Sequence, residues 1–412
     1  MSKFFLLTVF FSFTYLQSAA QSNAKKLLNE AEKAFSAYGS KGGGVTSLID
    51  AKGKIEAALK DAEINKQAAA WLLKGKICTE IAGSPLYKNE TDPVSGDTYA
   101  LLAFQAFMKV YESSSTTASE KTDVIKSLDP IAYPLLLAGN KLLEKNSNTK
   151  ALQHFQAAIR LTYVLPKSPW MDDSTYFQIV EVAGHAALGA GIHDEAYRYY
   201  KEIYEHKKLY AAGNIPESIY YGLISASIEA QGYPATEKLL AEAKKKYPNN
   251  NQWLFTEINY YMKAGSLNEL IPRLKKAIEL EPSNTGLYYT MAQVNENLWQ
   301  SEMAKSNIGN ASMYFTEAKK YYAQATAKDP GNTDVFYSAG ALFYNKAAYL
   351  TNEIQNNQGN ELKIKQLEAE VMSLMKDALP YFKKAESLSP NDGNVLTALF
   401  TIYKMLNDPL QK

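Results

Sequence analysis

Four segments of the chain end in the same way, and this recurrence constrains the fold more than any other feature. In each segment a run of mixed apolar and charged residues ends at a proline, and asparagine, aspartate, serine or glycine follows. The prolines are Pro248, Pro282, Pro330 and Pro390. Proline lacks a backbone N–H and disfavours the helical conformation in the residue before it. The pattern therefore predicts helices that end at these prolines, each followed by a short turn.

Upstream of each proline, three positions on one helix face mostly carry small, large and small residues. Before Pro390 they are Ala378, Phe382 and Ala385, at positions i, i+4 and i+7. Residues at this spacing share one side of a helix, which must fit closely against a neighbour. Variants of the pattern recur at Ala51–Ile55–Ala58, Ala151–Phe155–Ala158, Ala196–Tyr200–Ile203, Thr236–Leu240–Ala243, Leu270–Leu274–Ala277 and Ala318–Tyr322–Ala325.

The helix before several of these faces carries a glycine where the two backbones are expected to meet. Glycine inside a helix costs about 1 kcal/mol relative to alanine, so its presence needs a packing reason. A close approach of two helices supplies that reason. The glycines are Gly75, Gly139, Gly184 and Gly340.

In this register the sequence resembles the tetratricopeptide-repeat (TPR) family, whose helical hairpins repeat about every 34 residues. Pro248 and Pro282 are 34 residues apart. The resemblance implies an all-α fold, a right-handed α-solenoid of stacked antiparallel helical hairpins. Residues 21–129 are expected to hold divergent repeats, 130–392 the more regular array, and 393–412 a capping helix.

Two intervals exceed the repeat and predict two elongated hairpins. Pro282 to Pro330 spans 48 residues, and Pro330 to Pro390 spans 60. If the excess is shared between two antiparallel helices, each helix gains about seven residues in the first hairpin and about thirteen in the second. The hairpins are expected at 285–330 and 333–390, with tips at SNIGN (306–310) and QNNQGN (355–360).

Residues 1–20 have the order of residues typical of a secretory signal peptide. Lys3 precedes an apolar run over 4–16, and small residues at Ser18 and Ala20 precede a cleavage site before Gln21. The apolar run is too short to span a bilayer, and no cysteine follows that could carry a lipid. The sequence thus predicts an exported bacterial protein, periplasmic or secreted, that is soluble after cleavage. Its single cysteine, Cys78, excludes an internal disulfide.

The residue types that support catalysis or nucleic-acid binding do not occur in suitable patterns. The 44 basic and 43 acidic residues are intermixed along the chain, without the basic stripe that attracts phosphates. The four histidines lack metal-ligand spacing, and neither a phosphate-binding loop nor a nucleophile elbow is present. We therefore expect a non-enzymatic protein with no catalytic residue, no cofactor, no metal site and no nucleic-acid partner.

In the TPR family the first helix of each hairpin lines a concave groove. Carried over to this sequence, the family's fifth positions give an aromatic row of Tyr221, Phe255, Tyr289 and Tyr337. The ninth and thirteenth positions give an amide row of Asn259, Gln293, Asn297 and Asn345, and the ninth positions of two earlier repeats give Asn140 and His185. None of the fifth or ninth positions in the repeats around 136–225 carries a lysine or arginine, which disfavours a clamp for a C-terminal carboxylate.

Such a surface suits an extended segment of a partner protein. Amide side chains offer a donor and an acceptor to a peptide backbone, and tyrosine offers an apolar face with a polar tip. The alternative partner is a glycan, including peptidoglycan, whose sugar rings would stack on the same aromatic row. A further interpretation is that these rings pack between neighbouring repeats and meet no ligand.

Overall fold

The computed structural model describes residues 21–39, 44–85, 91, 97–165, 172–206, 215–230, 232–356 and 359–407. The predicted signal peptide, residues 1–20, lies outside them. The described residues are almost entirely helical, with one isolated bridge between Thr91 and Thr98, which confirms the all-α class. The chain divides into two compact units, Met1–Ala243 and Lys244–Lys412, and each is described by itself.

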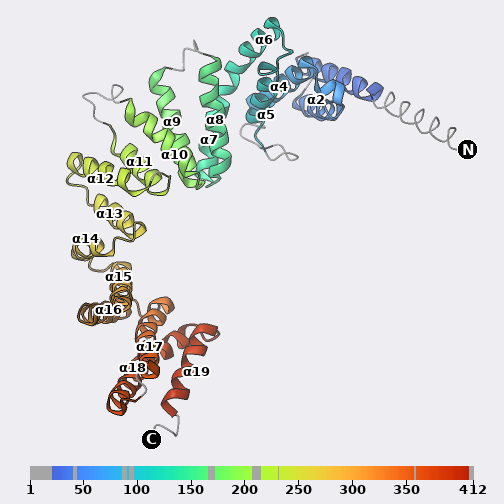
Figure 1. The fold of residues 1–412 in the computed structure, drawn as a ribbon. Helices are drawn as coiled ribbons and strands as arrows, with labels where there is room; N and C mark the ends of the chain where they lie inside the picture. Colours follow the sequence, from blue (N-terminus) through green and yellow to red (C-terminus); the bar gives the residue numbers. More distant parts are fainter. Residues whose placement is uncertain are drawn as a thin grey trace, which may run out of the picture. The chain divides into compact units, whose positions relative to one another are not determined.

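The first unit begins with helical residues 21–38 and continues as a succession of packed helices (Figure 1). They are α2 (Val45–Ala58), α3 (Ala62–Asn65), α4 (Ala68–Gly83), α5 (Tyr99–Tyr111), α6 (Ala118–Leu128), the 3-10 turn η1 (Asp129–Ile131), α7 (Ala132–Glu144), α8 (Asn148–Val164), α9 (Asp173–Gly189), α10 (His193–Glu205), α11 (Glu217–Ala230) and α12 (Tyr233–Lys246), which ends just past the unit's limit.

The second unit consists of three hairpins and a final helix, all visible in Figure 1. Its helices are α13 (Gln252–Lys263), α14 (Leu267–Leu280), α15 (Thr285–Ala304), α16 (Ile308–Lys328), α17 (Thr333–Asn356), α18 (Glu361–Leu388) and α19 (Gly393–Asn407). The helices α14, α16 and α18 each end two residues before the proline that was predicted to end them.

The elongation of the last two hairpins is confirmed. The helices α13 and α14 have 12 and 14 residues, α15 and α16 have 20 and 21, and α17 and α18 have 24 and 28. The turn between α15 and α16 comprises residues 305–307, so it overlaps the start of the predicted tip at 306–310, and residues 308–310 already belong to α16. Along α18, Leu367, Val371, Leu374 and Met375 are buried in the core that α17 shares.

The pattern of small, large and small residues forms the buried contact inside each hairpin. Phe155 of α8 and Phe382 of α18 are almost fully buried, and so are the alanines that flank each of them. A Cβ atom added to Gly139 of α7 would lie 2.7 Å from the Phe155 ring, and one added to Gly340 of α17 would lie 2.9 Å from the Phe382 ring. Only glycine leaves room for the ring, which is why a residue of poor helix propensity stands inside these helices.

The same contact joins other helices of the first unit, including the region of divergent repeats. Gly75 of α4 faces the ring of Phe107 in α5, so these two helices form a hairpin of the same kind. The ring of Tyr200 in α10 lies against both Gly184 of α9 and Gly222 of α11. One aromatic residue thus fills the space in its own hairpin and against the next hairpin.

Four hairpin turns in the described part of the chain share one backbone geometry. After α7, the N–H of Ser147 donates to the carbonyl of Leu142 at 2.8 Å and that of Asn146 donates to Leu143 at 2.9 Å. Asn146 between them adopts the left-handed conformation with φ of 55°. This is the Schellman motif, which satisfies the last carbonyls of a helix. Equivalent turns are centred on Gly191, Gly265 and Ser306.

The final helix, α19, packs against α18 through Val395, Leu399 and Ile402. Its other side carries Phe400, which is 70% exposed, beside the partly exposed Leu396 and Tyr403. The predicted cap is therefore a helix, and its outer face carries these three residues beside the exposed Asn394, Thr397 and Lys404. The predicted domain limits at 129 and 392 stay a prediction. None of the helices in the described residues is both long enough and apolar enough to cross a bilayer.

Candidate functional site

A cleft of about 390 Å³ lies on the second unit, where residues of five consecutive helices, α13 to α17, come together. Its volume falls in the range of small-ligand pockets. The helix α15 supplies six of the lining residues, Thr290, Gln293, Val294, Glu296, Asn297 and Gln300. The remaining residues are Met262, Leu267, Tyr322, Ser338 and Ala341.

The position of α15 in the hairpin places its amide side chains in the cleft. One side of this helix is buried in the core through Leu287, Met291 and Leu298. Gln293, Asn297 and Gln300 are exposed, with the spacing i, i+4 and i+7 that puts them on one side of a helix. Three amide groups therefore lie in a row along the cleft, each with a donor and an acceptor.

A carboxylate lies beside this row. The hydroxyl of Tyr322 donates a hydrogen bond of 2.6 Å to Oε2 of Glu296, and the side chain of Asn345 also hydrogen-bonds to Glu296. Burial raises the pKa of Glu296 above its usual range, and the two hydrogen bonds oppose this shift because they stabilise the charged form. Burial, together with the Glu296 charge, also raises the pKa of Tyr322, so its phenol stays protonated and remains a donor.

Three members of the predicted aromatic row lie in the second unit, and all three are partly buried against its core. The hydroxyl of Tyr289 hydrogen-bonds to Ser338 at 2.9 Å, and its ring centroid lies 6.1 Å from that of Tyr322. The ring of Tyr337 meets Phe382 edge-on at 5.6 Å. Phe255 packs against the same core. These rings therefore have a packing role, and ligand contact stays a prediction for them.

The amide row differs from the aromatic row in exposure. Asn259, Gln293, Asn297 and Asn345 are all exposed in the second unit. Gln293 and Asn297 line the cleft directly, and Asn345 reaches its edge through Glu296. In the first unit, Asn140 on α7 and His185 on α9 are exposed, and Tyr221 on α11 is half-buried.

Five polar or aromatic groups of the cleft were not predicted from the sequence: Thr290, Glu296, Gln300, Tyr322 and Ser338. One signal was available. The large position of the α16 pattern is a tyrosine, as it is in α10, whereas phenylalanine, leucine or isoleucine fills this position in the other helices. A buried tyrosine hydroxyl needs a partner, and Glu296 is that partner.

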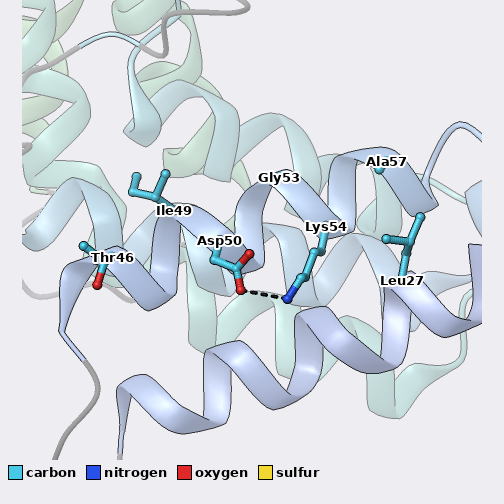
Figure 2. A pocket seen from close by; sticks show the side chains of 7 residues that line it. All are labelled: Leu27, Thr46, Ile49, Asp50, Gly53, Lys54 and Ala57. Atoms are coloured by element: carbon cyan, nitrogen blue, oxygen red, sulfur yellow. Dashed lines mark hydrogen bonds and ion pairs between the residues drawn. The ribbon is translucent and has the colours of Figure 1, made fainter.

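A second hollow, of about 570 Å³, lies in the first unit between the helical residues 21–38 and α2. Figure 2 shows Asp50 and Lys54 pointing toward each other along α2, joined by an ion pair of 2.8 Å. Lys54 also lies 3.8 Å from Glu30. The charged groups on this wall already pair with one another, and the other lining residues are Leu27, Thr46, Ile49, Gly53 and Ala57. The hollow thus offers few free polar groups, and the cleft on α15 is the better candidate site.

Among the described residues, no group of three His, Cys, Asp or Glu side chains is placed to hold a metal ion. Cys78 is buried inside α4. His154 is buried as well, between a backbone carbonyl and the hydroxyl of Thr98, so it contributes to the core rather than to a surface site.

No protein-family model and no curated protein matches the sequence, but solved structures do. A TPR protein from Bacteroides fragilis is 22% identical, with 56% of this chain and 98% of that chain covered and a TM-score of 0.32. A TPR protein from Parabacteroides merdae is 14% identical, with 66% and 98% covered and a TM-score of 0.39. YrrB, described as a TPR protein with an unusual peptide-binding site, is 19% identical, with 68% and 96% covered and a TM-score of 0.27.

The hairpins themselves carry the fold assignment, since these superpositions are partial. Antiparallel helix pairs recur along both units, and in several of them an aromatic or leucine side chain of the second helix fills the space against the first. By fold, the described part of the chain is an all-α succession of antiparallel helical hairpins, as the sequence predicts.

Proposed function

We propose that the chain is an exported, non-enzymatic scaffold that binds an extended segment of a partner protein in the cleft along α15. The observation that carries the proposal is the exposed row of Gln293, Asn297 and Gln300 on one side of that helix. An extended peptide presents backbone N–H and C=O groups at regular intervals, and each amide side chain can donate to one and accept from another.

The walls of the cleft fit the same partner. Met262, Leu267, Val294 and Ala341 supply apolar surface beside the polar row. Peptide recognition commonly combines main-chain hydrogen bonds, which give affinity, with pockets for side chains, which give specificity. The cleft contains both kinds of group within about 390 Å³.

Glycan binding, the alternative, depends on aromatic faces that are free to stack on sugar rings. Tyr289 and Tyr337 are instead half-buried, and each contacts another aromatic ring of the core. We therefore propose a polypeptide as the partner, and the test below includes glycans as the alternative.

The test is a peptide-display selection and a glycan array, both on the chain that begins at residue 21. Selected peptides should bind the parent, and Gln293→Leu should weaken their binding about tenfold, because an apolar side chain replaces an amide that makes one or two hydrogen bonds. The matched control is Gln366→Leu, which changes an exposed glutamine of α18 outside the cleft.

Equal losses for Gln293→Leu and Gln366→Leu would show that the peptides bind elsewhere. Binding to glycans with no peptide selected would replace the proposal by its alternative. Melting temperatures of both variants should match the parent, because both side chains are exposed.

A further inference from the structure

Glu296, which is partly buried, differs from Glu257, the buried carboxylate among the described residues of its unit. Glu257 is 8% exposed and is paired with two cations, since Lys244 lies 2.8 Å and Arg273 lies 3.7 Å from its Oε1. Glu296 is partly buried, yet no lysine or arginine in the described part of the chain forms an ion pair with it. Its two hydrogen-bond partners, Tyr322 and Asn345, are both neutral. A buried charge ordinarily has a cation or a metal beside it.

Lys346, the lysine next to Asn345 in the chain, pairs with a different carboxylate. Lys346, the residue after Asn345, forms an ion pair of 2.9 Å with Glu370 of α18 and lies over the ring of Phe315. None of the residues that line the cleft is a lysine, arginine or histidine. Glu296 is thus the single carboxylate of a cleft without a positive charge of its own.

The rest of the lining suits a long basic side chain. Lysine and arginine have an apolar stem that packs on apolar surface and a charged head that only donates hydrogen bonds. Met262, Val294 and Ala341 supply apolar wall for the stem. Beside Glu296, the amide oxygens of Gln293 and Asn297 can accept the N–H groups that the carboxylate leaves unpaired.

We propose that the cleft holds a lysine or arginine side chain of the bound segment, with the Glu296 carboxylate as its counter-ion. This proposal rests on the proposed function, because it takes the partner to be a polypeptide. Tyr322 and Asn345 act as positioning residues: their hydrogen bonds hold the carboxylate in the cleft whether or not a ligand is present.

The test compares a selected peptide that contains lysine with the same peptide acetylated at that lysine, which removes the charge and keeps the stem. Affinity for the parent chain should fall about tenfold or more on acetylation, because a charge-assisted hydrogen bond is lost. Glu296→Gln should weaken the lysine peptide by a similar factor and leave the acetylated peptide unchanged. The glutamine oxygen can still accept from Tyr322, so this variant should fold.

The control variant is Glu317→Gln, which makes the same change of net charge on α16, where Glu317 pairs with Lys320 rather than lining the cleft. It should bind both peptides as the parent does. Equal affinity of the parent for the charged and the acetylated peptide would overturn the proposal without any variant. So would a loss in Glu296→Gln that is the same for both peptides, since that result indicates a structural role.

The outcomes separate the two proposals. If peptides are selected, depend on Gln293 and share no basic residue, the proposed function stands and the role of Glu296 as counter-ion is wrong. If no peptide binds in any selection, both proposals fall together.

Discussion

The hydroxyl of Tyr322 donates a 2.6 Å hydrogen bond to Oε2 of Glu296, and this bond links the two long helices of the α15–α16 hairpin. The ring of Tyr322 is 2% exposed and fills the large position of the repeat pattern. One residue therefore packs the hairpin and orients the carboxylate of the cleft.

Tyr322→Phe should preserve the packing of the α15–α16 hairpin but remove the hydrogen bond that orients the Glu296 carboxylate. Loss of a hydrogen bond to a charged group costs about 1–2 kcal/mol in a partly buried site, and it removes an effect that stabilises the charged form. The pKa of Glu296 should therefore rise further above its usual range. Chemical denaturation measures the first effect, and NMR titration of the glutamate carboxyl carbons measures the second. A pKa of Glu296 that stays the same in the variant would contradict this account.

Gly184→Leu should be strongly destabilising. A Cβ atom at this position would lie 3.0 Å from the ring of Tyr200, which is also held against Gly222. The ring has no space to retreat, and overpacking typically costs about 1–3 kcal/mol. The matched control is Gly53→Ala, because nothing lies within 4 Å of a Cβ atom added there. That control should be neutral or up to about 1 kcal/mol more stable, since alanine is the better helix former. Thermal melts of Gly184→Leu that coincide with the parent would show that the contact does not matter.

Tyr289→Ala separates packing from binding in the aromatic row. Tyr289 is half-buried beside Tyr322 and bonded to Ser338 of the next hairpin, so its truncation should cost about 2 kcal/mol, less than a fully buried aromatic. The melting temperature should fall for Tyr289→Ala and stay near the parent value for Gln293→Leu. If Tyr289→Ala melts like the parent but loses peptide binding, the ring of Tyr289 contacts the ligand and does not serve mainly in packing. Each repeat contacts only its neighbours, so the melts are expected to be broad.

His154 should make the first unit sensitive to acid. Its Nδ1 lies 2.7 Å from the carbonyl of Lys150, which can only accept, so Nδ1 carries the proton. Nε2 then accepts from the hydroxyl of Thr98 at 2.6 Å. Burial lowers the pKa of His154 below 6.5, so as the pH falls below about 6.5 the unfolded chain takes up a proton before the folded chain does.

The stability of the first unit is therefore highest above the pKa of His154 in the unfolded state, and it declines as the pH drops from there toward the lower pKa of the folded state. Denaturation curves of the parent from pH 7.5 to 5 should show this decline, and His154→Gln should reduce its slope. A parent whose stability does not change over this range would contradict the assignment of a neutral, buried histidine.

The sequence by itself determined the hairpins, their lengths and the contact inside them. The prolines mark where α14, α16 and α18 end, and the intervals of 48 and 60 residues gave the elongation of the last two hairpins. The glycines of α7 and α17 face the predicted phenylalanines of the following helices. These features are readable because they are local or recur at a fixed period, so each repeat confirms the alignment of the next.

Only the tertiary structure decided which polar side chains meet. Glu296, Tyr322 and Asn345 come from three different helices, and His154 and Thr98 are 56 residues apart in the chain. Side-chain periodicity assigns a residue to one face of a helix. It does not show whether a buried tyrosine only packs or also orients a carboxylate, because that depends on which residue lies opposite its hydroxyl. The pairing depends on how far α15, α16 and α17 extend past one another and how they are rotated. Those quantities follow from the packing of the whole unit, because many weak apolar contacts set them together and no single motif does.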